Sequence, residues 1–508
     1  MMKVQITMRN HRFFRVGGNY LGLIAALTSF YCVHSASAAG VLRVPSETYP
    51  TIESALSVAA TGDIVELSSG SYMLQNYEGI TVPSGVTLKG LGDSPADTVI
   101  KAYSENEADT KSASLVSVSN GILQNLTFEG ARSHEEETLI YRSLIATNES
   151  LISGCIFTDA KITGKGAFCG GVAFISNSKI ERTIIRNTKT DEEIKNWSPS
   201  SQICCLENSE MVDCLVENNS ARLLAAGMVQ MSGTSVLKNT TVRKNILMQT
   251  SNWGWATPGV RVQTAGALID GCIIEENYAE ESPTSGVRSN FYKAAGGLVL
   301  NNQATVENSI IRNNRVEDGG AGGVLVRYGA SVLKNLLIVG NQILNPHTSE
   351  TRYEQYVGGL RFASINANNT FENTKIYNCT VSGNIVGGIS ETGEEVPMFL
   401  SHGVYYQNYK SYTYNCIFYG NGTLPSSVNY NDCSRSLKYN CCMQDPFFVN
   451  SAKGDYRLMA NSPCIDAGNE DSGVPNVDLK GVPRPYGKGI DIGCYEWVKP
   501  LGLRVIIR

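Results

Sequence analysis

The stretch Thr305-Val306-Glu307-Asn308-Ser309-Ile310-Ile311-Arg312-Asn313-Asn314 is one copy of a motif that recurs along this chain of 508 residues. Each copy has an apolar residue, a spacer, Asn or Gly, usually Cys, Ser or Thr, two apolar residues, and an Asn three or four places later. Taking the residue after the Asn or Gly position as a marker, the copies fall at Leu126, Cys155, Thr183, Cys214, Thr240, Cys272, Ser309, Leu336, Cys379 and Cys416. A unit of about 26 to 30 residues, lengthened by insertions, is typical of a stacked solenoid.

Each copy has the composition of a strand. It is short, rich in Ile, Val and Thr, bounded by Gly and Asn, and without the 3.6-residue spacing of a helix. One coil cannot bury its own apolar side, so the coils must stack with neighbouring strands about 4.8 Å apart. We therefore predict that the marker residues face the coil interior, where free Cys packs as a small apolar residue.

The Asn that follows each copy would form a column in such a stack. Its members are Asn187, Asn219, Asn245, Asn277, Asn314, Asn341, Asn384 and Asn421. Asn tolerates left-handed backbone angles, and its amide can bond the next Asn along the stack. We interpret this column as a structural turn device.

A second phrase containing Gly precedes the copies, with Gly171, Gly227, Gly259, Gly297, Gly323, Gly359 and Gly403. Two strands per unit plus turns predict an all-β fold, a single-stranded right-handed parallel β-helix. The two phrases resemble the repeats of pectate-lyase-like proteins, and this resemblance covers most of residues 41–497. It implies a solenoid of about 10–12 coils.

Residues 1–38 have the pattern of a signal peptide. A basic start without acidic residues precedes an apolar run over residues 20–33 and the small-residue site Ala36-Ser37-Ala38. We predict cleavage after Ala38 and a secreted, periplasmic or surface location. The apolar run is too short for a membrane span, so we expect no transmembrane segment in the mature chain.

Residues 39–110 are predicted to form the N-terminal cap and first coils. Thr51 can cap a short helix with Ile52, Ala55 and Leu56 on its apolar side. This resembles the start of pectate-lyase-like and pectinesterase-like β-helices, in which a helix plugs the open end. The pectinesterase motifs are missing downstream, which argues against that activity. Residues 111–440 then hold the repeats with their loop insertions.

Residues 441–508 are predicted to form a C-terminal cap. Asp445-Pro446-Phe447, Gly454-Asp455-Tyr456, Ser462-Pro463-Cys464 and Asp491-Ile492-Gly493-Cys494 follow in the order of the choice-of-anchor Q ending of bacterial β-helix proteins, which they resemble. Asp466, Asp478 and Asp491 could hold a cation, but we favour structural capping. We predict no cofactor, with structural or catalytic Ca²⁺ as the open alternative.

Five cysteines crowd this last part of the chain: Cys433, Cys441, Cys442, Cys464 and Cys494. Export makes a disulfide among them plausible. Their spacings do not fit a zinc site with four ligands.

The insertions share one position in the repeat, at residues 188–201, 246–257, 278–294, 342–356 and 385–401. They should therefore emerge on one side of the solenoid, which is often the working face. They carry Trp253, Trp255 and Tyr353, whose rings suit stacking on sugars. The alternative is that these rings anchor the loops on the coil.

Alternation along the Gly-containing strands predicts which side chains point outward. They include Arg261, Gln263, Asn301, Arg327, Arg361, Tyr405 and Gln407. An array of guanidinium groups suits an acidic polymer. In pectate-lyase-like β-helices the base is commonly Arg or Lys, so the resemblance implies Arg327 or Arg361 as the base of a β-elimination. We predict Tyr405 as its acid, with the remaining residues binding substrate. The alternative is a solvated strand face without chemistry, and we see no carboxylate on these strands for a calcium-assisted lyase.

The sequence thus predicts an exported bacterial protein, expected to be a monomer, that binds and possibly cleaves an acidic polysaccharide. A glycoside hydrolase would need two carboxyl groups, which only the loops could supply. The competing class is a non-catalytic surface protein that binds glycans or mediates adhesion. Loss of residues 1–38 would take the formal net charge from −5 to −9, which argues against a nucleic acid partner.

Overall fold

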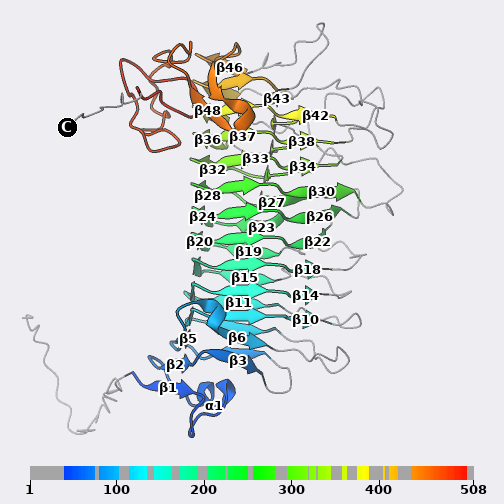
Figure 1. Cartoon of the computed structure of the whole chain (residues 1–508), viewed down its shortest axis with the longest axis vertical. Helices are drawn as coiled ribbons and strands as arrows, with labels where there is room; N and C mark the ends of the chain where they lie inside the picture. The colour runs from blue at the N-terminus through cyan, green and yellow to red at the C-terminus, as the bar shows by residue number, and fades with distance from the viewer. Residues whose placement is uncertain are drawn as a thin grey trace, which may run out of the picture. The chain divides into compact units, whose positions relative to one another are not determined.

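A computed structural model describes residues 39–74, 79–101, 114–133, 142–162, 172–190, 203–223, 227–249, 256–281, 294–317, 320–327, 330–344, 357–362, 374–387, 404–406, 411–421 and 436–499. The predicted signal peptide lies outside these residues. In the described part of the chain, four parallel sheets, here called A to D, run through successive windings (Figure 1).

Sheet A has 14 strands. They are β1 (Val41–Val44), β2 (Ile64–Leu67), β5 (Thr87–Gly90), β8 (Ile122–Gln124), β12 (Leu151–Ser153), β16 (Lys179–Glu181), β20 (Glu210–Val212), β24 (Val236–Lys238), β28 (Ala267–Asp270), β32 (Ala304–Glu307), β36 (Val332–Lys334), β40 (Thr374–Tyr377), β44 (Ser411–Tyr414) and β46 (Ser436–Tyr439).

A strand of sheet B follows each sheet A strand from β2 to β44, and sheet B has 12 strands among the described residues. They are β3 (Gly70–Met73), β6 (Thr98–Lys101), β9 (Thr127–Glu129), β13 (Ile156–Thr158), β17 (Ile184–Arg186), β21 (Leu215–Glu217), β25 (Thr241–Arg243), β29 (Ile273–Glu275), β33 (Ile310–Arg312), β37 (Leu337–Val339), β41 (Thr380–Ser382) and β45 (Ile417–Tyr419).

Sheet D follows sheet B and has nine short strands among the described residues. They are β10 (Arg132–Ser133), β14 (Lys161–Ile162), β18 (Lys189–Thr190), β22 (Ser220–Leu223), β26 (Ile246–Gln249), β30 (Tyr278–Glu281), β34 (Arg315–Val316), β38 (Gln342–Ile343) and β42 (Ile385–Val386).

Sheet C closes the winding and has 11 strands. They are β4 (Ile80–Val82), β7 (Val116–Ser119), β11 (Leu144–Thr147), β15 (Ala173–Ser176), β19 (Cys204–Glu207), β23 (Gly227–Ser232), β27 (Thr257–Val262), β31 (Leu298–Leu300), β35 (Val324–Val326), β39 (Leu360–Phe362) and β43 (Val404–Tyr406).

The predicted fold class is confirmed, since every strand of these four sheets pairs in parallel with strands one winding away, and a right-handed solenoid is consistent with this arrangement. The predicted content of one winding was wrong. A winding such as β32, β33, β34 and β35 holds four strands rather than two. Sheet D was missed because its strands occupy the first residues of the segments interpreted as insertions, as β26 and β30 do.

The turn between sheets A and B explains the sequence motif. Its Asn or Gly takes left-handed backbone angles, with φ of 51° at Asn308 and 66° at Gly271. Asn and Gly tolerate this region because an ordinary Cβ crowds the backbone there. The next residue then points inward, and Cys272, Ser309 and Cys379 are no more than 1% exposed. The predicted interior position of the marker residues is confirmed.

The Asn column is confirmed from Asn219 to Asn421 as a chain of amide hydrogen bonds. The Nδ2 of Asn277 donates to Oδ1 of Asn314 at 2.9 Å, and Asn314 donates in the same way to Asn341 at 2.9 Å. Two details were wrong. Thr188, not Asn187, is the first member, because its backbone N–H donates to Oδ1 of Asn219 at 3.1 Å. The left-handed residue is the one before the column, such as Asn313 with φ of 54°.

The predicted N-terminal helix is present as α1 (Ile52–Leu56). Thr51 caps it, and its Oγ1 accepts from the backbone N–H of Ser54 at 3.2 Å. Ile52, Ala55 and Leu56 are buried and belong to the core that runs through the coils. The cap therefore covers apolar surface at the first winding. The described residues also form two 3-10 helices, η2 (Pro95–Asp97) and η6 (Ser451–Lys453).

The C-terminal segment packs on the outer face of sheet B. Its antiparallel strands β47 (Phe448–Asn450) and β48 (Asp455–Leu458) carry Phe448 and Leu458 into a cluster with Leu337 and Val339 of β37. This contact covers the last windings. No helix in the described residues has the length and hydropathy that a membrane span requires.

Candidate functional site

The outer face of sheet C between β27 and β39 carries the predicted arginines. Val260, Val262, Leu360 and Phe362 belong to the core, so the residues between them point outward as predicted. The register runs from Arg261 through Val299 and Leu325 to Arg361 and then Tyr405, one strand at a time. Arg261 and Arg361 are therefore three strand spacings apart, about 14 Å.

These arginines face outward but are covered. Arg261 and Arg327 are each 5% exposed, and Arg361 is 2% exposed. The alternative of a solvated strand face is therefore wrong for these three side chains. Part of the cover is local, because a Cβ on Gly227 would lie 2.8 Å from the Cβ of Arg261, so only glycine fits there.

A small apolar cluster lies on this outer face. It consists of Ala295, Val299, Ala321 and Leu325, and it is separate from the core inside the coils. Parallel bridges link Ala295 to Ala321 and Ala321 to Val357. The arginines thus border apolar surroundings, and burial lowers the pKa of Arg261 to about 10.

Three predicted site residues form a hydrogen-bonded row. Arg327 Nη1 donates to Oδ1 of Asn301 at 2.7 Å, and Asn301 Nδ2 lies 3.4 Å from Oε1 of Gln263. Asn301 is 4% exposed, whereas Gln263 is half-buried. The row therefore runs from the buried guanidinium of Arg327 toward solvent.

Of the other predicted residues, only Tyr405 belongs to the part of the chain that the structure describes. Trp253, Trp255, Tyr353 and Gln407 lie outside the described residues. Tyr405 is placed only by its strand, where it is the register partner of Arg361.

The insertions share one place in the winding. Sheet D strand β26 ends at Gln249 and sheet C strand β27 begins at Thr257, and the same order holds from β30 to β31 and from β42 to β43. Each insertion therefore leaves sheet D and enters sheet C. This places their ends beside the face that carries the arginines.

The sequence prediction missed two polar residues on this face. Gln230 is the register partner of Arg261 and is 9% exposed. Glu207 ends β19, is exposed, and lies 3.5 Å from the hydroxyl of Ser176. The expectation that the Gly-containing strands supply no carboxylate holds for β23, β27, β31, β35 and β39, and Glu207 is a carboxylate of sheet C outside them. Glu207 follows Cys204-Cys205, not a Gly-Gly pair, so the motif used to find the strands did not include it.

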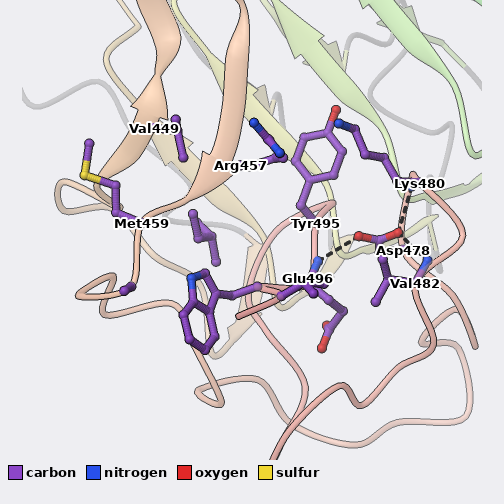
Figure 2. Close-up of a pocket in the computed structure, with 12 residues that line it drawn as sticks. Val449, Arg457, Met459, Asp478, Lys480, Val482, Tyr495 and Glu496 are labelled. Atoms are coloured by element: carbon purple, nitrogen blue, oxygen red, sulfur yellow. Dashed lines mark hydrogen bonds between the residues drawn. The ribbon is translucent and has the colours of Figure 1, made fainter. Parts of the chain in front are cut away.

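A separate pocket of about 430 Å³ lies in the C-terminal segment (Figure 2). Val449, Met459 and Val482 give it apolar walls. Its Arg457 is held by Asp455, with Nε to Oδ1 at 2.8 Å, and Lys480 Nζ lies 5.8 Å from the Tyr495 ring centroid. Both cations are thus already engaged within the protein, and the pocket shares no lining residue with the sheet C face.

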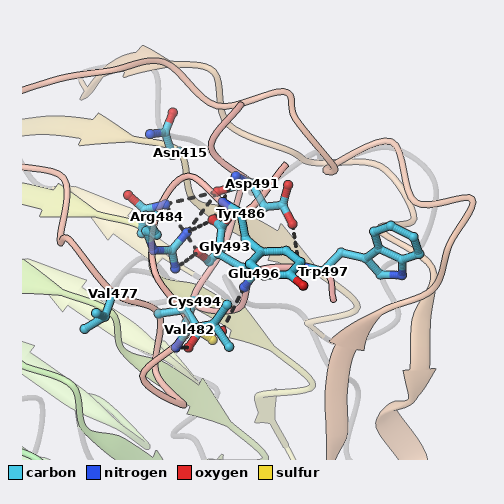
Figure 3. Close-up of polar contacts among 12 residues, drawn as sticks. Asn415, Val477, Val482, Arg484, Tyr486, Asp491, Gly493, Cys494, Glu496 and Trp497 are labelled. Carbon is cyan, nitrogen blue, oxygen red and sulfur yellow. Dashed lines mark hydrogen bonds and ion pairs between the residues drawn. The ribbon is translucent and has the colours of Figure 1, made fainter. Parts of the chain in front are cut away.

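The predicted acidic cluster of this segment binds backbone N–H groups. Asp491 accepts from Trp497 N at 2.5 Å (Figure 3) and from Asp466 N at 2.7 Å. Asp478 accepts from Lys480 N at 2.7 Å (Figure 2). Burial raises the pKa of Asp491 to about 6. These contacts are those of structural capping, and among the described residues no group of His, Cys, Asp and Glu side chains is arranged to hold a metal ion.

One ion pair connects the turns of this segment. Arg484 Nη1 lies 2.6 Å from Glu496 Oε1, with the two side chains 1% and 0% exposed (Figure 3). Glu496 also accepts from Asp491 N at 3.0 Å and Tyr486 N at 2.9 Å. Removing either charge would leave the other buried without its partner, which is strongly destabilising.

No protein-family model matches the sequence, and no curated protein sequence matches it either. Solved structures similar to this chain include the pectate lyase Pel9A, at 13% identity over 91% of this chain and 97% of that chain, with a TM-score of 0.36. Another is XylC in complex with xylose, at 10% identity over 90% and 98% of the two chains, with a TM-score of 0.37. The A-module of the Azotobacter vinelandii mannuronan C-5 epimerase AlgE6 is 14% identical over 71% and 92%, with a TM-score of 0.28. The fold assignment itself rests on the sheet topology.

Proposed function

We propose that this protein binds an acidic polysaccharide along the outer face of sheet C. The observation that carries the proposal is the placement of Arg261, Arg327 and Arg361 on one outer face within four successive windings. The strands β27, β31, β35 and β39 contain no Asp or Glu. A guanidinium group pairs with carboxylate or sulfate in a fixed fork geometry, which favours an acidic polymer.

The hydrogen-bonded row supplies orientation. Asn301 holds the guanidinium of Arg327 at 2.7 Å, and Gln263 lies at the more exposed end of the row. Burial strengthens a charge interaction because fewer water molecules screen it. The polymer would contact Gln263 first, with Gln407 as a further polar contact and with Trp253, Trp255 and Tyr353 stacking on sugar rings.

A second proposal is that the same site cleaves the polymer by β-elimination. Arg361 and Tyr405 are register partners on adjacent strands, which supports their pairing as base and acid. Arg361, or Arg327, would take the proton from C5 of a uronate. The C4–C5 double bond forms as the bond from C4 to the leaving oxygen breaks, and Tyr405 would protonate that oxygen. Burial lowers the pKa of Arg261, a third guanidinium of this face, to about 10.

We further propose that this activity lies outside the cytoplasm, because the first 38 residues carry the export pattern. The C-terminal segment would serve there as a cap with the choice-of-anchor Q pattern.

The test is a panel of acidic polysaccharides incubated with the purified protein. Retardation in a gel containing the polymer reports binding, and ultraviolet absorbance of an unsaturated product reports elimination. Arg327→Gln should lose both, whereas Arg243→Gln on sheet B should retain both. Retention without product would support binding alone, and equal behaviour of the two variants would overturn the proposed face.

A further inference from the structure

Two cysteine side chains meet where the last winding joins the C-terminal segment. Cys442 pairs with β45 through a parallel bridge to Ile417, and its backbone N–H donates to Cys416 O at 2.9 Å. Cys464 lies in the C-terminal segment, where its carbonyl accepts from Ile492 N at 2.9 Å. Both pack in the apolar cluster that joins this segment to sheet B. Each thiol shifts the pKa of the other, so the two side chains are near one another, and Cys442 Sγ donates to Gln444 O at 3.5 Å.

We infer that Cys442 and Cys464 form a disulfide in the exported protein and fasten the C-terminal segment to the last winding. Both are thiols in this structure. The bond would close a chain loop that contains β47 and β48, the strands that cover the outer face of sheet B. The inference does not depend on the proposed polysaccharide site, because none of these residues belongs to the sheet C face.

The structure distinguishes this pair from other cysteines nearby. Cys441 points into the coil, where its Sγ donates to Thr413 O at 3.6 Å and its neighbour is Cys416. Cys494 is fully buried beside β41, and its backbone N–H donates to Oγ1 of Thr380 at 3.1 Å. The sequence alone could not make this choice, because all of them lie within one short region.

The environment of the two thiols sets the order of the chemistry. Cys442 is partly exposed, and the side chain of Cys464 lowers the pKa of the Cys442 thiol to about 7. Cys464 is fully buried, and the side chain of Cys442 together with burial raises the pKa of its thiol. The thiolate is the nucleophile in disulfide exchange. Cys442 should therefore react first.

The step needs an oxidant, which is a small-molecule or protein disulfide of the export compartment. The Cys442 thiolate attacks one sulfur of that disulfide, forms a mixed disulfide and releases one thiolate. Cys464 then loses its proton, attacks Cys442 Sγ and releases the second thiolate. Two electrons and two protons pass to the oxidant, which leaves as two thiols.

The first test maps cysteine states in the full chain exported into an oxidising compartment. The protein is denatured in an alkylating reagent, digested and analysed by mass spectrometry. We expect a Cys442–Cys464 linked peptide that separates on reduction, and alkylated thiols at Cys155, Cys379 and Cys494. Alkylation of both Cys442 and Cys464, or a link from Cys442 to another cysteine, would overturn the inference.

The second test traps the first intermediate in reduced protein mixed with glutathione disulfide. Cys464→Ala should accumulate glutathione on Cys442, because the second thiol is missing. Cys442→Ala should remain unmodified at Cys464, which is buried. Cys494→Ala is the matched control, since it removes a buried thiol of the same segment and should still form the linked pair. Equal labelling of Cys442 and Cys464 in the single variants would contradict the assigned order.

A variant that fails to fold would not leave the inference untested, because the mapping of the unmodified chain is independent of any substitution. Proteolysis gives a further readout on that chain. Reduction should increase cleavage within residues 443–463 several-fold, and an unchanged cleavage rate would argue against a fastening role.

Discussion

The outer faces of sheets B and C both carry arginines in the middle windings. On sheet B these arginines alternate with glutamates, and on sheet C apolar residues lie between Arg261 and Arg361. On sheet B, Glu217, Arg243, Glu275 and Arg312 follow one another strand by strand. Arg243 Nε lies 2.9 Å from Glu217, and Arg312 Nε lies 2.7 Å from Glu275. This face neutralises itself along the stack.

On sheet C, the positions between Arg261 and Arg361 hold Val299 and Leu325. The strands supply cations and apolar contacts but no acid at these positions. The pKa values of the arginines on the two faces shift in opposite directions. The hydrogen bond to Glu217 raises the pKa of Arg243, whereas burial lowers the pKa of Arg261 to about 10. The outer face of sheet B pairs its charges along the stack, and the outer face of sheet C is the face that we propose binds an external anion.

A large effect is expected from making sheet C resemble sheet B. Leu325→Glu would place a carboxylate beside Arg361, as Glu275 lies beside Arg312. The new acid would pair with the guanidinium and repel the polymer, so affinity for an acidic polysaccharide should fall by about tenfold to a hundredfold, the value of one charge-assisted contact. Titration calorimetry measures the change. Leu325→Gln controls for the loss of apolar packing, and equal losses in both variants would contradict the charge argument.

Gly227→Ala tests the cover over Arg261. The new Cβ would lie 2.8 Å from the Cβ of Arg261, so the two strands must separate. We expect a loss of about 1–3 kcal/mol in the free energy of unfolding, as for other overpacked sites. Denaturant titration measures it. Gly62→Ala is a useful contrast, because a Cβ there meets no atom within 4 Å and only the backbone angle is strained. A smaller loss at Gly227 than at Gly62 would show that the close approach is unimportant.

The turns and core were predictable from sequence because short-range chemistry decides them. Asn308 must accept left-handed angles, and Ser309 must fit the interior. Both positions therefore recur as a pattern in the sequence. Sheet D left no such trace, since strands such as β34 have two residues and no alternating pattern. The Asn column was predicted, but its left-handed residue was assigned one place too late because Asn313 and Asn314 are adjacent and identical.

The candidate site was harder to predict. Alternation gave the direction of Arg261 and Arg361 correctly, since their neighbours in the strand are core residues. The burial of Arg261 depends in part on the close approach of Gly227, a residue of another strand, which no pattern along one strand reveals. The buried pair Arg484–Glu496 was missed for the same reason, because turns join these residues without any repeat.

Glu275→Gln tests the opposite face. The substitution removes the carboxylate between Arg243 and Arg312, whose side chains are 37% and 43% exposed. We expect the free energy of unfolding to fall by about 1 kcal/mol, because exposed ion pairs contribute little. Polymer affinity should remain unchanged. A drop in affinity equal to that of Leu325→Glu would remove the distinction between the faces.

The smallest effect concerns pH. Because the folded pKa of Arg261 lies at about 10, below its ordinary value of 12.5, the unfolded chain binds more protons above that pH. The charged side chain therefore destabilises the folded state at neutral pH, and this penalty fades as pH rises through 10. The stability of the natural chain relative to Arg261→Gln should increase between about pH 9 and 11. A difference that does not change with pH would contradict the burial of this charge.

The most direct measurement compares two double variants for binding to the same acidic polysaccharide at fixed salt. Arg327→Ala with Arg361→Ala removes charge from sheet C, and Arg243→Ala with Arg312→Ala removes it from sheet B. We predict that the sheet C pair weakens binding by about a hundredfold or more, with the sheet B pair within about twofold of the natural chain. Equal affinities in the two double variants would contradict the assignment of the outer face of sheet C as the binding face.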